Sequence, residues 1–126
     1  MNLLSRAAAI LLLTYSAMAF AGETIHFSGV LKSEKSMTTV FQQARAYAGS
    51  NGWSIDETYS NATTLVLLPH PQCEPVVLRF NGTQLTPAFS KTVLAGYKTH
   101  QQVLGLFKKL GPAFDKLNVH DESEYE

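Results

Sequence analysis

Hydrophobic and polar residues alternate early in the chain and then change to a helical pattern. In residues 24–31 the hydrophobic side chains fall on alternate positions, which is typical of a half-buried strand. They are Ile25, Phe27 and Leu31, with His26 among the polar residues between them. In residues 37–48 hydrophobic positions recur every three or four residues, which predicts an amphipathic helix. We expect Ser36 to cap its start and the glycines of residues 49–52 to end it.

Residues 53–68 read as two further strands. In the first, the alternation places Trp53, Ile55 and Tyr59 on one face. In the second, residues 63–68 are rich in β-branched and aliphatic side chains until Pro69 stops the pattern.

A hairpin is predicted in residues 75–95. Asn81-Gly82 lies between two extended runs and is the dipeptide that best tolerates the positive φ angles of a two-residue turn. Pro87 lies within the second run, and because proline cannot donate to a strand ladder, it indicates an edge strand or a bulge.

The last pattern is helical. Thr99 and Gln102 match a capping box, in which each side chain bonds to the backbone of the other residue. A narrow apolar stripe follows at spacings of four and three, made of Val103, Phe107, Leu110, Phe114 and Leu117. Gly111-Pro112 interrupts the stripe, so we expect a kink or two short helices.

The predicted order is therefore strand, helix, four strands and helix. Such segregation favours an α+β fold, with a mostly antiparallel sheet of four to five strands and both helices on one face. Residues 22–126, about 105 in number, are expected to form a single domain. The strand order stays open, because the helix after the first strand allows more than one position for the second.

Residues 1–21 have the organisation of a cleavable signal peptide. Arg6 precedes an uncharged apolar run, and Ala19 and Ala21 are the small residues that a signal peptidase needs. We expect cleavage before Gly22 and a periplasmic or secreted protein without a stable membrane anchor. The short, alanine-rich leader favours a bacterial host. An uncleaved N-terminal anchor is the alternative interpretation.

Charge and motifs limit the function classes. The ten Lys and Arg residues balance ten Asp and Glu, and loss of Arg6 with the leader leaves 9 − 10 = −1. This balance does not favour nucleic acid or an anionic membrane as partner. The sequence contains no P-loop, dinucleotide-binding, nucleophile-elbow or zinc-protease motif. We therefore favour a protein that is not an enzyme and needs no cofactor.

The lone cysteine lies in a proline-rich connection. Cys73 follows His70 by three residues, and this pair of ligand types suits zinc or copper. Two ligands do not close a metal site, and His26, His100 and His120 are scattered along the sequence. The simpler interpretation is that the prolines fix an extended connection and Cys73 packs against the edge of the core.

A second candidate site lies before the last helix. If Lys91 and Thr92 face away from the helices and His100 lies in the first helical turn, the three could meet at one edge. A helix N-terminus favours an anion, so they would suit a carboxylate or phosphate. The alternative is that Lys91 and Thr92 are the solvent-facing part of a strand.

Three stretches, "PHPQCEPVVLRF", "KTVLAGYKTH" and the ending "DESEYE", resemble a pattern found in small uncharacterised bacterial exported proteins. The ending is similar to D-E-x-E-Y-W, although Glu126 stands here in place of the tryptophan. The resemblance implies no activity. It implies that a set of residues belongs together: Cys73, Glu74, Lys91, Thr92, His100, Asp121, Glu122 and Tyr125. On this ground Glu74 joins the candidate ligand-binding residues.

The preferred hypothesis is an exported, non-catalytic protein that binds another protein or a small ligand, and an inhibitor or immunity role would fit its size. A thiol- or metal-dependent protein that uses Cys73 and His70 is the alternative. A small hydrolase without a recognisable motif is a third hypothesis. An exposed apolar patch on the open face of the sheet would favour the binding protein, because monomers seldom leave one uncovered.

Overall fold

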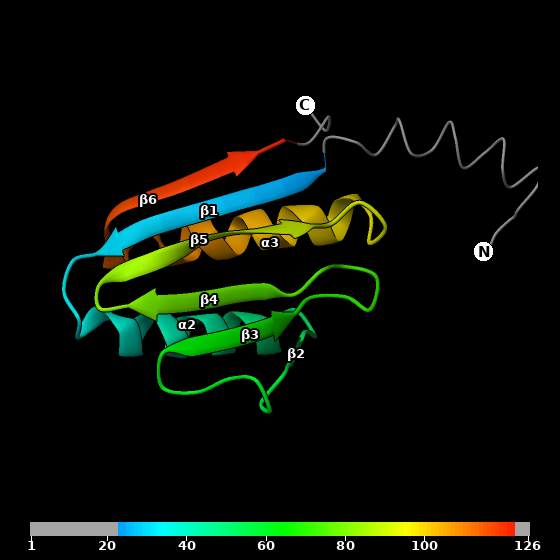
Figure 1. Ribbon diagram of the computed structural model, residues 1–126. Helices are drawn as coiled ribbons and strands as arrows, with labels where there is room; N and C mark the ends of the chain where they lie inside the picture. Colours follow the sequence, from blue (N-terminus) through cyan, green and yellow to red (C-terminus); the bar gives the residue numbers. More distant parts are fainter. Residues whose placement is uncertain (1–22, 123–126) are drawn as a thin grey trace, which may run out of the picture.

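Within residues 23–122, the computed structural model contains two helices and six strands. In chain order they are β1 (Thr24–Leu31), α2 (Ser36–Ser50), β2 (Ser54–Ile55), β3 (Thr64–Leu68), β4 (Val76–Asn81), β5 (Gln84–Lys91), α3 (Tyr97–Leu110), the 3-10 turn η1 (Gly111–Ala113) and β6 (Phe114–Asp121) (Figure 1). The structure describes residues 23–122. The predicted signal peptide at residues 1–21, its cleavage before Gly22, and Tyr125 lie outside the described residues.

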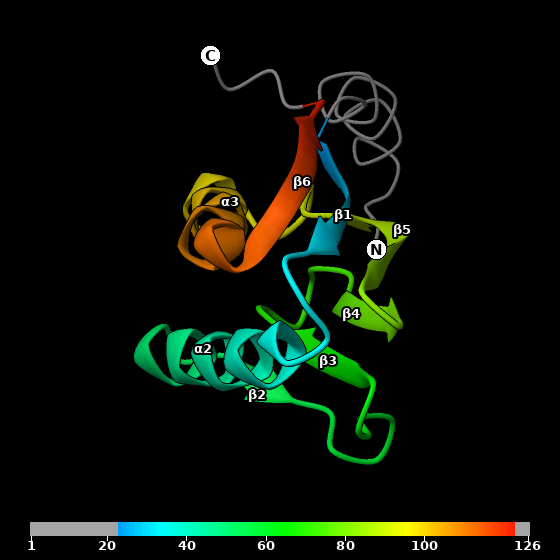
Figure 2. The same ribbon diagram turned by 90° about the vertical axis from the view of Figure 1, so that its left-hand side faces the viewer.

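The strands form one antiparallel sheet in the order β2-β3-β4-β5-β1-β6. Figure 2 shows α2 and α3 side by side on one face of this sheet, while the opposite face, which we call the uncovered face, has no helix of the described residues 23–122 over it. The α+β prediction with both helices on one face is therefore confirmed, and the sheet has six strands where four to five were expected. In the part of the chain that the structure describes, neither helix has the length and apolar character to cross a bilayer.

The core lies between the sheet and the two helices. Strand β1 sends Ile25, Phe27 and Leu31 into it, all at most 2% exposed, as the alternation predicted. The Phe27 ring lies 4.6 Å from that of Phe107 on α3, measured between centroids. Gly29 lies between these inward residues, where a Cβ atom would meet the Lys116 backbone oxygen at 2.7 Å. Because glycine has no Cβ atom, β6 can approach β1 closely at this point.

Both predicted N-terminal helix caps are wrong, whereas α2 ends at Ser50, within the predicted residues 49–52. Helix α2 begins at Ser36 itself, with Lys35 at the N-cap and no side-chain cap. Helix α3 begins at Tyr97, two residues before the proposed capping residue Thr99, which is buried inside the first turn. Gly96 is its N-cap with φ of 94°, a conformation that glycine adopts without strain. A tight turn therefore starts α3 where we expected a hydroxyl cap.

The second half of the predicted C-terminal helix is also wrong. Helix α3 ends at Leu110, and Gly111-Pro112 forms η1, in which the proline occupies a position that needs no backbone donor. Phe114 and Leu117 then belong to β6, which pairs with β1 at the edge of the sheet. The other edge is shorter than expected, because β2 spans only Ser54–Ile55 and Tyr59 is 72% exposed in the loop that follows.

Pro87 makes a bulge, one of the two outcomes predicted for it. The register between β1 and β5 shifts between Phe27 and Gly29, opposite the proline. Strands β4 and β5 are paired only at Phe80–Leu85 and Asn81–Gln84, next to the hairpin turn. Beyond these pairs they separate, since Pro87 has no N–H for a ladder. The sheet is consequently hollowed around Pro87 on its uncovered face.

Candidate functional site

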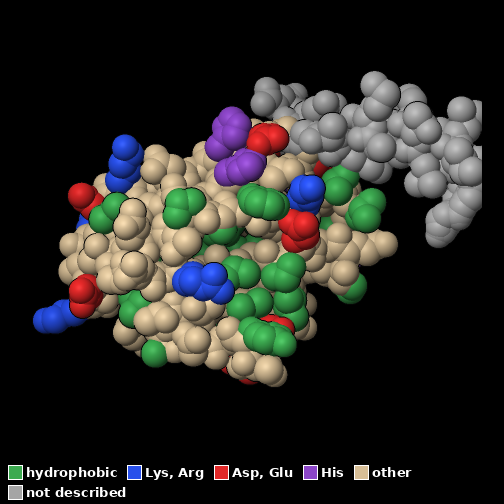
Figure 3. Space-filling view, viewed as in Figure 1, with side chains coloured by type: hydrophobic (Ala, Val, Ile, Leu, Met, Phe, Trp, Pro, Cys, Tyr) green, Lys and Arg blue, Asp and Glu red, His purple; other side chains and the backbone are tan. Residues whose placement is uncertain are grey.

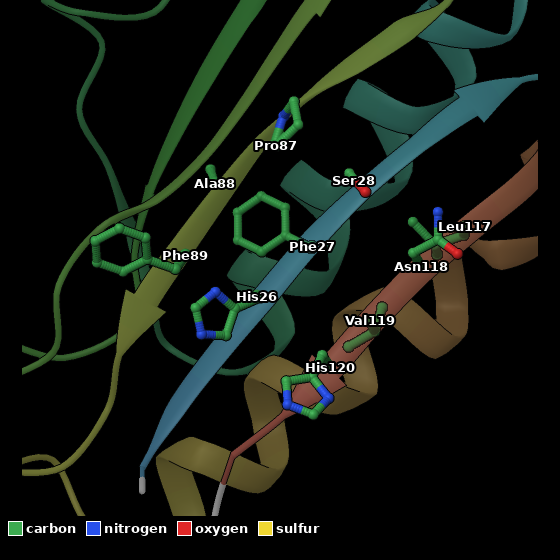
Figure 4. A pocket seen from close by; sticks show the side chains of 10 residues that line it. All are labelled: His26, Phe27, Ser28, Pro87, Ala88, Phe89, Leu117, Asn118, Val119 and His120. Atoms are coloured by element: carbon green, nitrogen blue, oxygen red, sulfur yellow. The ribbon is translucent and has the colours of Figure 1, made fainter. Parts of the chain in front are cut away.

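The uncovered face carries a row of ring-bearing side chains across three strands. His26 on β1 pairs with Phe89 on β5 and with His120 on β6, so the three side chains point to the same face. The His26 ring lies 5.8 Å from Phe89 and 5.9 Å from His120, measured between centroids. Figure 4 shows His26 between the other two rings. The three rings therefore form one continuous line of cross-strand neighbours over β5, β1 and β6.

Two shallow hollows adjoin this row. The larger, of about 640 Å³, lies over β5, β1 and β6 and includes Ser28 and Asn118 in its lining. The smaller, of about 300 Å³, lies where β4 and β5 separate and includes Val77 and Arg79. Pro87, Ala88 and Phe89 line both. Phe89, whose ring contacts that of His26, is 52% exposed between the two hollows.

Polar groups flank the apolar centre of this face. The Glu122 carboxylate accepts a hydrogen bond from Nε2 of His26. Figure 3 shows histidine side chains beside an acidic group near the top of the face, with hydrophobic side chains below. An aromatic centre with a polar rim is the usual composition of a binding surface. The histidines were interpreted as scattered along the sequence, because no strand was predicted at His120.

The predicted ligand-binding residues Glu74, Lys91, Thr92 and His100 gather at the C-terminal end of β5, directly after Phe89. Together with Cys73, Ser90 and Asp121 they form what we call the β5 corner. Here Glu74 joins the proline-rich loop to β5. Its backbone N–H donates to the Lys91 oxygen at 3.0 Å, and its carboxylate accepts from the Lys91 N–H at 3.0 Å. The Ser90 hydroxyl donates to the Glu74 backbone oxygen at 2.8 Å. The Glu74 side chain therefore already has a structural partner.

A buried chain of polar groups crosses the β5 corner. The Thr92 hydroxyl lies 2.6 Å from Nδ1 of His100, whose Nε2 lies 2.9 Å from the Asp121 carboxylate. Thr92 and His100 are both 0% exposed. Glu23 lies beside them, and its backbone oxygen accepts from the Thr92 N–H at 3.2 Å. The chain links β5, the first turn of α3 and the end of β6.

This order of hydroxyl, imidazole and carboxylate is that of a nucleophile, its base and the group that orients the base. Substrate would need access to the hydroxyl, and burial denies it that access here. The two hydrogen bonds of His100 therefore serve to hold β5, α3 and β6 together. An anion site formed by Lys91, Thr92 and His100 stays a prediction.

Six of the eight residues in the set implied by the resemblance lie at the β5 corner: Cys73, Glu74, Lys91, Thr92, His100 and Asp121. Glu122 points to His26 on the uncovered face instead. Ser90 also belongs to the β5 corner. It was not predicted as a site residue, because one serine in a strand carries no distinctive sequence pattern. The only indication in the sequence is the alternation of β5. This alternation places the Ser90 side chain on the core face, opposite Ile25.

His70 and Cys73 lie in the loop between β3 and β4. The Gln72 N–H donates to Nδ1 of His70 at 3.0 Å, and the Cys73 thiol donates to the Glu74 backbone oxygen at 3.2 Å. Cys73 is 8% exposed, and burial raises the pKa of its thiol, partly opposed by the Ser90 hydroxyl. Within residues 23–122 no group of three or more His, Cys, Asp and Glu side chains is placed to hold a metal ion. The burial and raised pKa of Cys73 fit a packing residue better than a reactive thiol.

The raised pKa leads to a test of the Cys73 thiol. Because less thiolate is present at a given pH, the folded protein should react with an aromatic disulfide at pH 8 at least about tenfold more slowly than protein unfolded in urea. The measurement is the rate of thiolate release by absorbance. Ser90→Ala removes the hydroxyl that favours the thiolate, so it should not accelerate the reaction. Equal rates for folded and unfolded protein would show an accessible, reactive thiol.

Comparison of the chain with protein-family models, with curated proteins and with solved structures gives no match.

Proposed function

We propose that this protein is an exported, non-catalytic binding protein that holds its partner on the uncovered face of the sheet. The supporting observation is Phe89, which is 52% exposed where the two hollows meet. Exposed aromatic side chains in a partly concave, polar-rimmed surface are the residues that contribute most to binding energy. An inhibitor or immunity role would use the same surface.

The position of Phe89 follows from the sequence around it. Pro87 removes a ladder donor, the strands β4 and β5 separate, and the face becomes concave beside the aromatic ring. Arg79 on β4 and the histidines on β1 and β6 supply polar contacts at the rim. Aromatic and arginine side chains together are enriched at the centres of protein interfaces. We therefore favour a protein partner over a small molecule, which would need a more enclosed pocket.

The test places a photo-crosslinking amino acid at position 89 of the protein in its exported compartment. We expect one adduct of defined mass. Tyr59 is a matched control position, since it is an even more exposed aromatic residue, at 72%, in the loop after β2. An excess of unlabelled wild-type or Tyr59→Ala protein should suppress the adduct at position 89, whereas Phe89→Ala protein should not. Equal adducts at both positions, or full competition by Phe89→Ala, would contradict the proposal.

A further inference from the structure

The histidine pair on the uncovered face suggests a second binding chemistry, independent of the proposed partner. We propose that His26 and His120 form an open, two-histidine site for a divalent transition-metal ion of the zinc, copper and nickel group, and that Glu122 orients His26. Failure of this inference would leave the proposed function standing, because metal binding and partner binding are measured separately.

The register brings the two imidazoles together. His26 and His120 are direct partners in the antiparallel ladder of β1 and β6, and such pairs have Cβ atoms about 4.5–5.5 Å apart. The two ring centroids are 5.9 Å apart with planes tilted by 40°. A metal–nitrogen distance of about 2.0–2.1 Å places the centres of two rings on one tetrahedral ion roughly 5–6 Å apart. The observed separation therefore needs little rearrangement of either strand.

Glu122 supplies the partner that a metal-bound histidine needs. The His26 Nε2 hydrogen bonds to the Glu122 carboxylate, and in the neutral imidazole that a metal ion binds, Nδ1 then carries the lone pair. A histidine that binds a metal commonly donates its other ring N–H to a carboxylate, which fixes the tautomer and makes the ligating nitrogen more basic. His120 is exposed at the edge of the sheet and can turn either nitrogen toward the ion.

The number of protein ligands defines the kind of site. Residues 23–122 contain no group of three or more His, Cys, Asp and Glu side chains placed for a metal, so the ion would have two protein nitrogens. Imidazole suits zinc, copper and nickel, whereas magnesium and calcium prefer oxygen ligands. Two nitrogens leave at least two positions of a tetrahedral ion open to the hollow beside the pair. Water, or a donor group from a bound molecule, would fill them.

The first experiment is calorimetric titration of the exported protein with Zn²⁺, with Mg²⁺ as the control ion. We expect one Zn²⁺ per chain and no response to Mg²⁺. His26→Gln and His120→Gln should each weaken Zn²⁺ binding at least about tenfold, and Glu122→Ala about tenfold, in the range seen for residues that orient ligands. His70→Gln is the matched control, since His70 lies in the loop between β3 and β4 and should leave the affinity unchanged.

A second measurement uses wild-type protein only, so it does not depend on whether a variant folds. Substoichiometric Cu²⁺ should broaden the ring proton resonances of His26 and His120 before those of His70 and His100. Unchanged Zn²⁺ affinity in His26→Gln or His120→Gln would overturn the proposal. Loss of affinity in His70→Gln, or earlier broadening of His70, would overturn it too and move the metal to the Cys73 loop.

Discussion

Replacing His100 by leucine is expected to lower the free energy of unfolding by about 3 kcal/mol. Leucine fills most of the space of the imidazole but makes neither of its two hydrogen bonds. The Thr92 hydroxyl, which is 0% exposed, loses its 2.6 Å partner, and the Asp121 carboxylate loses the imidazole on its buried side. Urea unfolding followed by the fluorescence of Trp53, which is 7% exposed, measures the change.

Two further variants separate the hydrogen bonds from a general effect of losing a histidine. Thr92→Val keeps the side-chain shape and removes only the hydroxyl, so it should cost about 1–2 kcal/mol. His70→Leu changes a histidine that accepts a local hydrogen bond from the Gln72 N–H, and should cost less than about 1 kcal/mol. If His100→Leu costs no more than His70→Leu, the buried chain does not hold the β5 corner together.

Gly29→Ala is expected to cost about 2–3 kcal/mol, because the added methyl group has no space. It would lie 2.7 Å from the Lys116 backbone oxygen and 3.0 Å from the Phe114 ring, and the first of these is backbone that cannot rotate away. Strand β6 must therefore move off β1. Besides the lower stability, the variant's β6 amide hydrogens should exchange faster than they do in the wild type. Exchange in β3, which is distant from the substitution, should increase less.

The same substitution elsewhere should have the opposite sign. Gly49 lies in α2, and a Cβ atom there meets nothing within 4 Å. Since alanine favours a helix by up to about 1 kcal/mol relative to glycine, Gly49→Ala should stabilise the protein slightly. A Gly29→Ala protein as stable as the wild type would mean that β6 is not held at the described distance from β1.

The alternation of residues 24–31 and the helical spacing of residues 37–48 were sufficient to predict β1 and α2, because each buries one face against a single core. The region after Leu110 was predicted wrongly for a physical reason. Phe114 and Leu117 continue the helical spacing of α3, but each is also an inward position of an edge strand. Only the backbone requirement of Pro112 distinguishes the two structures, and it was interpreted as a kink.

The candidate site divides in the same way. Thr92 and His100 were expected to meet only if Thr92 faced away from the helices. The structure places the two side chains in contact, but Thr92 is buried against α3. The row of Phe89, His26 and His120 depends on the pairing of β1 with β5 and β6. A sequence does not show which distant strands are neighbours, so this row was not predicted. The assignment of Phe114 and Leu117 to a helix removed the remaining signal.

The position of β1 determines when the sheet can be completed. Ile25 pairs with Ser90 and with Asp121, and the second partner comes 121 − 25 = 96 residues later. A chain that emerges N-terminus first therefore holds β1 without its neighbour β5 for about 90 − 25 = 65 residues, and without its other neighbour β6 for longer still. Pairs so far apart in the sequence give the fold a high contact order, and closing such long loops slows folding. The sheet thus stays incomplete until β6 has been synthesised, and β1 keeps one unpaired edge until then.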